Sequence, residues 1–146
     1  MLLKLQALLD LFAEYPDQAE RTELLLEYAD KFREVPADVA SRPFDRSALV
    51  PHCESEAYVW AAPNGDGTLK LYFAVENPSG VSAKALAAIL DRTLSGLPAA
   101  EIAKVDPEIV ERIFRQNISM GKGMGLMSMV QRVQALARRS AEEKSS

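Results

Sequence analysis

The sequence has very few of the residues that build disulfides, zinc sites and metal clusters. Its 146 residues include one cysteine, Cys53, and one histidine, His52. A single cysteine cannot form a disulfide within the chain, so a disulfide-stapled secreted scaffold is excluded. One cysteine and one histidine also cannot supply the ligands of a structural zinc site, or the thiolates of an iron–sulfur cluster held by this chain alone.

An excess of positive charge and long apolar runs are missing as well. The formal net charge is -4, which argues against a nucleic-acid-binding protein. No run of about 18 apolar residues occurs, so we expect no membrane-spanning helix. The first residues, MLLK, are soon followed by Asp10 and Glu14, which is unlike a signal peptide. A free thiol in a chain that is not exported indicates the reducing cytoplasm.

What is present is an ordinary globular composition, with 48% hydrophobic and 26% charged residues. The length predicts a single domain over residues 1–146. We expect the polar end of the chain, from about residue 141, to be frayed.

Hydrophobic periodicity predicts about six helices, two before the middle of the chain and four after it. The first carries Leu2, Leu5, Leu9 and Phe12 at steps of three and four residues. Asp17 followed by Glu20 is typical of a capping box that begins the second. The later four are expected at about 82–95, 98–105, 107–114 and from 126 onward, with Ser82 as a cap of the first of these and the glycine run 121–125 preceding the last.

The middle of the chain shows strand periodicity instead. Residues 56–62 are rich in Tyr, Val and Trp, and residues 68–76 alternate apolar and polar side chains. The segment 63–67, PNGDG, is a strong hairpin-turn signal. A short apolar run at 48–50, stopped by Pro51, predicts an edge strand. The fold class is therefore α+β, with a small antiparallel sheet of about three strands packed against about six helices.

Cys53 is the strongest nucleophile in the chain. A lone cysteine in such a protein is most often a small buried hydrophobic residue. Here it lies in a loop next to a proline and among polar neighbours, where the local pattern needs no apolar residue, and loops often carry function. A protease-like pair with His52 is disfavoured, because adjacent side chains of an extended segment point to opposite sides.

The glycine run 121–125 invites a phosphate-loop interpretation, but it follows a helix and lacks the Ser or Thr of that motif. A flexible start of the last helix is the simpler interpretation. If this helix N-terminus and Lys122 faced Cys53, they would favour a thiolate or a persulfide there.

Several other side chains have structural explanations by default. Tyr58 and Trp60 share one strand face and are expected in the core. The methionines near residue 124 are expected to fill gaps in the core, and a surface that contacts a partner is the alternative interpretation. The arginines of the last helix are expected on a solvated face, where they could also meet an acidic partner: Arg132, Arg138 and Arg139.

Around Cys53 the pattern resembles a known family. Residues 49–60, LVPHCESEAYVW, are similar to the segment of the SufE family in which Gly-Cys-Gln-Ser is soon followed by Val-Trp. The order of elements, the SAKAL segment after the sheet and the GKGMGL segment before the last helix resemble that family too. Three positions depart from it: His52 replaces Gly, Glu54 replaces Gln, and Lys122 stands where Arg is usual. Since Gly alone tolerates positive φ freely, His52 would make the loop stiffer.

The resemblance implies a SufE/IscU-like fold and a sulfur acceptor that works beside a cysteine desulfurase (SufS-like). The desulfurase carries pyridoxal phosphate and holds sulfur as a persulfide, which Cys53 as thiolate would take up and pass to an iron–sulfur scaffold. This chain would bind no cofactor of its own beyond the transient persulfide, and would act as a sulfurtransferase-like accessory protein more than as a stand-alone enzyme. Neighbouring residues expected to support the loop or contact the partner are His52, Glu54, Ser55 and Lys122.

An alternative is a regulatory module that binds a partner and whose cysteine is structural. A thiol redox protein is a third possibility, although a resolving cysteine is missing from the chain. A monomer and a homodimer are both compatible with the sequence.

Overall fold

A computed structural model describes residues 2–145 of the chain. It begins with two helices, α1 (Leu3–Ala13) and α2 (Gln18–Asp30). The predicted apolar stripe of α1 is buried at Leu5, Leu9 and Phe12. Asp17 caps α2 as predicted, since its carboxylate accepts a hydrogen bond from the Glu20 amide at 3.0 Å.

The middle of the chain forms a β-hairpin from β1 (Ala57–Pro63) and β2 (Leu69–Val75). The strands pair antiparallel, with Ala57 opposite Val75 and Pro63 opposite Leu69. One face of the hairpin packs into the main core against the helices. The other face packs under the loop before β1 in a smaller cluster whose buried members are Val35, Phe44, Ala48, Tyr58 and Ala74.

The predicted edge strand at 48–50 is wrong. Residues Arg46–Ala48 form a short 3-10 helix, η1, and only an isolated bridge from Leu49 to Tyr58 joins this segment to the hairpin. The sheet in the described residues therefore has two strands where about three were expected. The run is too short to extend the ladder, because Pro51 has no N–H to donate and the chain turns away at His52.

Four helices follow the hairpin: α3 (Val81–Leu94), α4 (Ala99–Ile102), α5 (Ile109–Phe114) and α6 (Met120–Ser145), with a second 3-10 helix, η2 (Arg115–Asn117), before the last. Ser82 does not cap α3, because the helix already begins at Val81 and Gly80 occupies the cap position. The glycine run 121–125 does not precede α6 but forms its first turns. The predicted frayed tail falls on the last turns of α6, which is helical through Ser145. Residue 146 lies outside the described residues, and the fraying itself stays a prediction.

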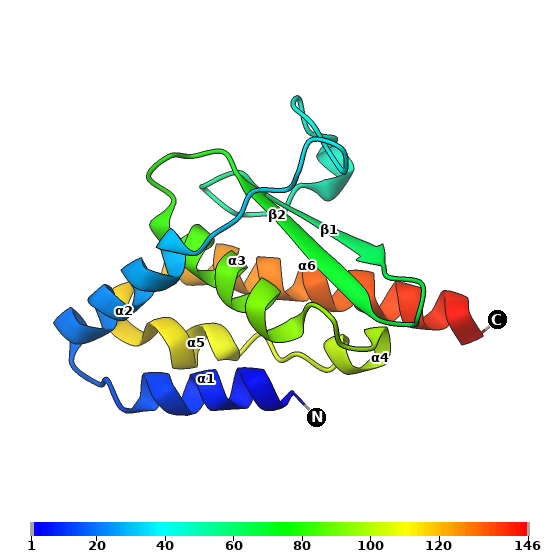
Figure 1. The fold of residues 1–146 in the computed structure, drawn as a ribbon. Coiled ribbons are helices and arrows are strands. Elements are labelled where there is room, and N and C mark those ends of the chain that lie inside the picture. The colour runs from blue at the N-terminus through cyan, green and yellow to red at the C-terminus, as the bar shows by residue number, and fades with distance from the viewer. Residues whose placement is uncertain (1, 146) are drawn as a thin grey trace.

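The helices lie on one side of the hairpin and the loop from 36 to 49 lies on the other (Figure 1), whereas Val50 and Cys53 pack on the side of the helices. The long helix α6 runs beneath the hairpin and contacts β1, while α3 contacts β2. The α+β class and the six α-helices of the described residues agree with the prediction. This arrangement brings the loop before β1 close to the first turns of both α3 and α6.

Candidate functional site

The loop that carries Cys53 closes over a cavity of about 270 Å³ between the beginnings of α3 and α6. The loop contributes residues 52–55, the β2–α3 connection and first turn of α3 contribute polar side chains and backbone, and α6 contributes its glycine-rich turns. The lining residues are His52, Cys53, Glu54, Ser55, Asn77, Ser79, Gly80, Val81, Ser82, Ala83, Gly121, Lys122, Gly125 and Leu126.

All five site residues named from the sequence line this cavity. His52, Cys53, Glu54 and Ser55 come from the loop itself, and Lys122 comes from the first turn of α6. The sequence could not place Lys122 near the cysteine, and the packing of α6 against β1 does so.

Cys53 is half-buried and packs against the main core. Backbone hydrogen bonds shape its loop: the Glu56 amide donates to the Cys53 carbonyl at 3.2 Å, and the Asn77 amide donates to the Ser55 carbonyl at 3.1 Å. The thiol is therefore on a turn tied to the start of the β2–α3 connection, and it is not one of the fully buried core side chains.

His52 takes a left-handed backbone conformation, with φ of +63°. Glycine adopts this conformation at little cost, whereas a side chain adds steric strain. The structure thus explains why Gly suits this position in the pattern that residues 49–60 resemble. The His52 side chain itself is exposed.

The beginnings of two helices lie at the cavity. The N-cap of α3 is Gly80, which has no side chain to satisfy the first amides, and α6 begins with the Lys122 amide donating to the Ser119 hydroxyl at 3.2 Å. The amide ends of helices favour nearby anions, and the Lys122 ammonium adds a full positive charge. Glu54 opposes them with one carboxylate on the same lining.

The sequence reasoning missed Gly80 and Gly125 as site residues. A Cβ at Gly125 would lie 2.8 Å from the His52 carbonyl oxygen, and a Cβ at Gly80 would lie 2.9 Å from the Ser55 hydroxyl oxygen. Only Gly125 lies inside a helix, where glycine lowers helix stability. Its presence there was the sequence signal that another segment approaches closely.

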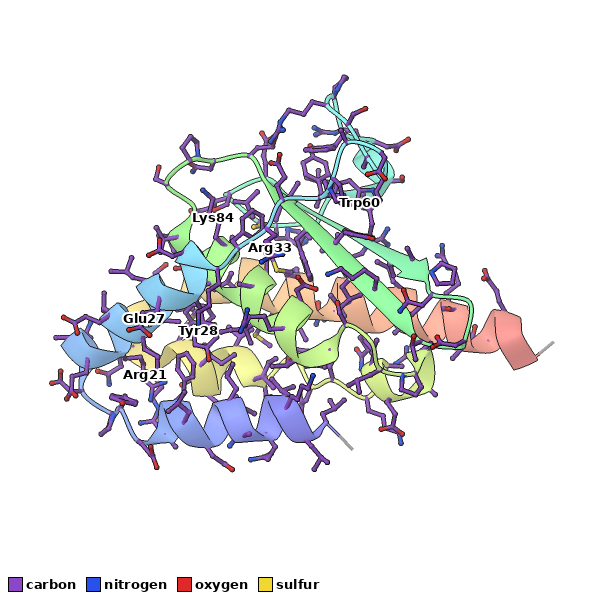
Figure 2. The ribbon with its side chains drawn as sticks, in the orientation of Figure 1. Arg21, Glu27, Tyr28, Arg33, Trp60 and Lys84 are labelled. Carbon is purple, nitrogen blue, oxygen red and sulfur yellow. The ribbon has the colours of Figure 1, made fainter. Side chains whose placement is uncertain are left out.

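The remaining candidates lie elsewhere or have structural roles. Tyr58 and Trp60 belong to the hairpin face under the loop, where both rings contact Phe44. Figure 2 labels Trp60 on this face. Met129 is buried as a core residue, whereas Met120 and Met124 are exposed. The arginines differ among themselves: Arg138 and Arg139 are exposed, and Arg132 donates to the Ser47 carbonyl at 2.7 Å.

No group of three or more His, Cys, Asp or Glu side chains in residues 2–145 is placed to hold a metal ion. None of the helices described here combines the length and apolar composition that a membrane crossing requires.

The chain is similar to a known protein family and to solved structures. The sequence model of the SufE family, described as an Fe-S metabolism associated domain, matches residues 6–137. A hypothetical protein from Thermus thermophilus, solved in solution, is similar to this chain with a TM-score of 0.73 and 28% identity over 95% of this chain and 96% of that one. A search of curated proteins found no match. Since the family match covers nearly the whole chain, including the Cys53 loop and the first turns of α6, the chain belongs to the SufE family and is associated with iron–sulfur metabolism.

Proposed function

We propose that this protein accepts sulfur from the persulfide of a pyridoxal-phosphate-dependent cysteine desulfurase onto Cys53 and passes it on for iron–sulfur cluster assembly. The observation that carries the proposal is the position of Cys53: the one thiol of a SufE-family chain lies half-buried on a loop over a cavity that contains Lys122 and two helix beginnings.

The transfer is an exchange between divalent sulfurs. The Cys53 thiolate attacks the terminal sulfur of the desulfurase persulfide, a new S–S bond forms, the old one breaks, and the desulfurase cysteine leaves as a thiolate. No net oxidation or reduction occurs, so the chain needs no bound cofactor for this step. Pyridoxal phosphate belongs to the partner, whose turnover is stimulated when the sulfur is removed.

The surroundings of Cys53 suit an anionic sulfur. The Lys122 ammonium and the first amides of α3 and α6 favour negative charge, and the cavity offers space for one added sulfur atom. A chain with one cysteine also has no neighbouring thiol that could discharge the persulfide as a disulfide. The working location that fits this chemistry is the reducing cytoplasm, with a SufS-like desulfurase and an iron–sulfur scaffold complex as partners.

The test is an intact-mass measurement after incubation with a SufS-like desulfurase and L-cysteine. We expect the wild-type protein to gain the mass of one sulfur atom, and Cys53→Ser to gain none and to lose stimulation of the desulfurase. The melting temperature of Cys53→Ser should stay close to that of the wild type. The alternative is a partner-binding regulatory module with a structural cysteine, and it would be supported if Cys53→Ser melted far lower or kept full stimulation.

A further inference from the structure

Gly125 of α6 approaches the backbone of the Cys53 loop closely. A Cβ at this position would lie 2.8 Å from the His52 carbonyl oxygen, 3.1 Å from the Cys53 Cα and 3.5 Å from the His52 carbonyl carbon. Carbon atoms in favourable contact stay about 3.5–4.0 Å apart, so only a residue without a side chain fits here. The contact is made with the peptide that leads into the reactive residue.

We propose that Gly125 is a positioning residue that lets the Cys53 loop close over the cavity and thereby restrains the reactivity of the resting thiol. The neighbouring glycines of the same helix do not have this role. A Cβ at Gly121 would meet no atom within 4 Å, and one at Gly123 would make an ordinary contact of 3.6 Å with the Ile118 side chain.

An added methyl group at residue 125 would move the loop and not the helix. The residues that follow Gly125 anchor α6 in the core, since Leu126, Met129 and Val130 are almost fully buried. Residues 51–56 are exposed or half-buried, and His52 already holds a left-handed conformation that a displaced loop could relax. A displacement of about half an ångström would clear the contact, and it would lift Cys53 away from the cavity.

The contact at Gly80 differs in kind. The three atoms nearest to a Cβ there would all belong to side chains: the Ser55 hydroxyl oxygen and the Val75 Cγ1 at 2.9 Å, and the Ser55 Cβ at 3.0 Å. At Gly125 the obstacle is backbone, which cannot move unless the whole turn moves. Gly125→Ala is therefore the sharper test. Gly123→Ala is its matched control, because both replace glycine by the best helix former on the same helix and residue 123 does not line the cavity.

The experiment measures the rate at which iodoacetamide alkylates Cys53, at a pH where the thiol is fully ionised. We expect Gly125→Ala to react at least about threefold faster than wild type, because the closed loop is destabilised, and Gly123→Ala to react at the wild-type rate. Equal rates for the two variants would overturn the proposal. A melting temperature no lower than that of the wild type shows that faster alkylation does not come from global unfolding.

If Gly125→Ala does not fold, the wild-type protein still tests whether the closed loop restrains the reactivity of Cys53. A thiol restrained over a cavity should discriminate against a bulky maleimide relative to iodoacetamide more strongly in the folded protein than in urea. The same ratio of rates in both states would overturn the proposal.

A second experiment, which rests on the proposed function, measures how fast the persulfide on Cys53 is lost. Persulfidated Gly125→Ala should lose its added sulfur to a small thiol faster than persulfidated Gly123→Ala. If no variant takes up sulfur at all, the proposed function fails, while the alkylation rates still judge the role of Gly125 separately.

Discussion

The connection between α2 and β1 is held in two different ways along its length. Side chains add to the backbone hydrogen bonds of its first half: Arg42 pairs with Glu34 and Glu76, and Phe44 packs against the hairpin. Its second half, residues 51–56, is held by backbone hydrogen bonds and by its close fit against glycines. Within residues 51–56 only Cys53 packs against the core, so this part can move at a smaller loss of core packing than the part before it, which buries Phe44 and Ala48.

Phe44→Ala should have the largest effect on stability. The Phe44 ring is buried between the loop and the outer face of the hairpin, with ring centroids 5.1 Å from Tyr58 and 5.2 Å from Trp60. Removing a buried aromatic ring costs about 3 kcal/mol of the free energy of unfolding. Urea denaturation measures this loss.

The same variant tests whether the two halves are independent. We expect the alkylation rate of Cys53 in folded Phe44→Ala to stay close to that of the wild type, and Phe44→Leu to recover much of the lost stability. If Cys53 became much more reactive in folded Phe44→Ala, the two halves of the connection would move together, which contradicts their proposed independence.

Arg42→Ala should have a smaller effect, and one that depends on pH. The Arg42 guanidinium donates to Glu34 at 3.0 Å and to Glu76 at 2.9 Å, and exposed ion pairs contribute little at neutral pH. The hydrogen bond from Arg42 holds the pKa of Glu34 below its ordinary value of 4.5. The contribution of Glu34 is therefore fully present above pH 4.5 and is lost as the pH falls through the lowered pKa of the folded state.

Urea midpoints measured between neutral and acidic pH check this prediction. The difference between wild type and Arg42→Ala should be largest at neutral pH and shrink in acid, and Arg42→Lys should fall between the two because it keeps the charge but not the paired contacts. A difference that grew in acid would contradict the assigned ion pairs.

The elements that the sequence predicted correctly are those that depend on local sequence patterns. The hairpin follows from alternation around the turn at 63–67, and the helices follow from apolar spacing. The start of α6 was placed wrongly because glycines usually weaken a helix, and the reason for Gly125 lies in a loop that is distant in the sequence. The motif around Cys53 predicted the loop half of the site, but only tertiary packing brings Lys122 and Gly80 to it.

Lys122→Ala should lower the rate of sulfur acceptance by about threefold, since a single exposed ammonium interacts modestly with an anion. The matched control Lys122→Arg keeps the positive charge and should keep most of the rate. The difference between Lys122→Ala and wild type should shrink at high salt, because ions screen the attraction. Stability should hardly change, as Lys122 is exposed. If Arg42→Ala slowed acceptance as much as Lys122→Ala, the positive charge beside the cavity would have no special role.

The effect expected at His52 concerns the backbone alone, and it tests the conformation of residues 51–56 directly. Glycine adopts φ of +63° readily, whereas alanine pays the steric cost of a Cβ, so His52→Gly should be more stable than His52→Ala by about 1 kcal/mol. Both variants lack the imidazole, so their difference in urea midpoint isolates the conformation of the backbone. Equal midpoints would mean that residue 52 does not hold the left-handed conformation in solution. The fit of Gly125 against the following peptide would then lose its geometric basis, and the Cys53 loop would no longer differ in kind from the loop before it.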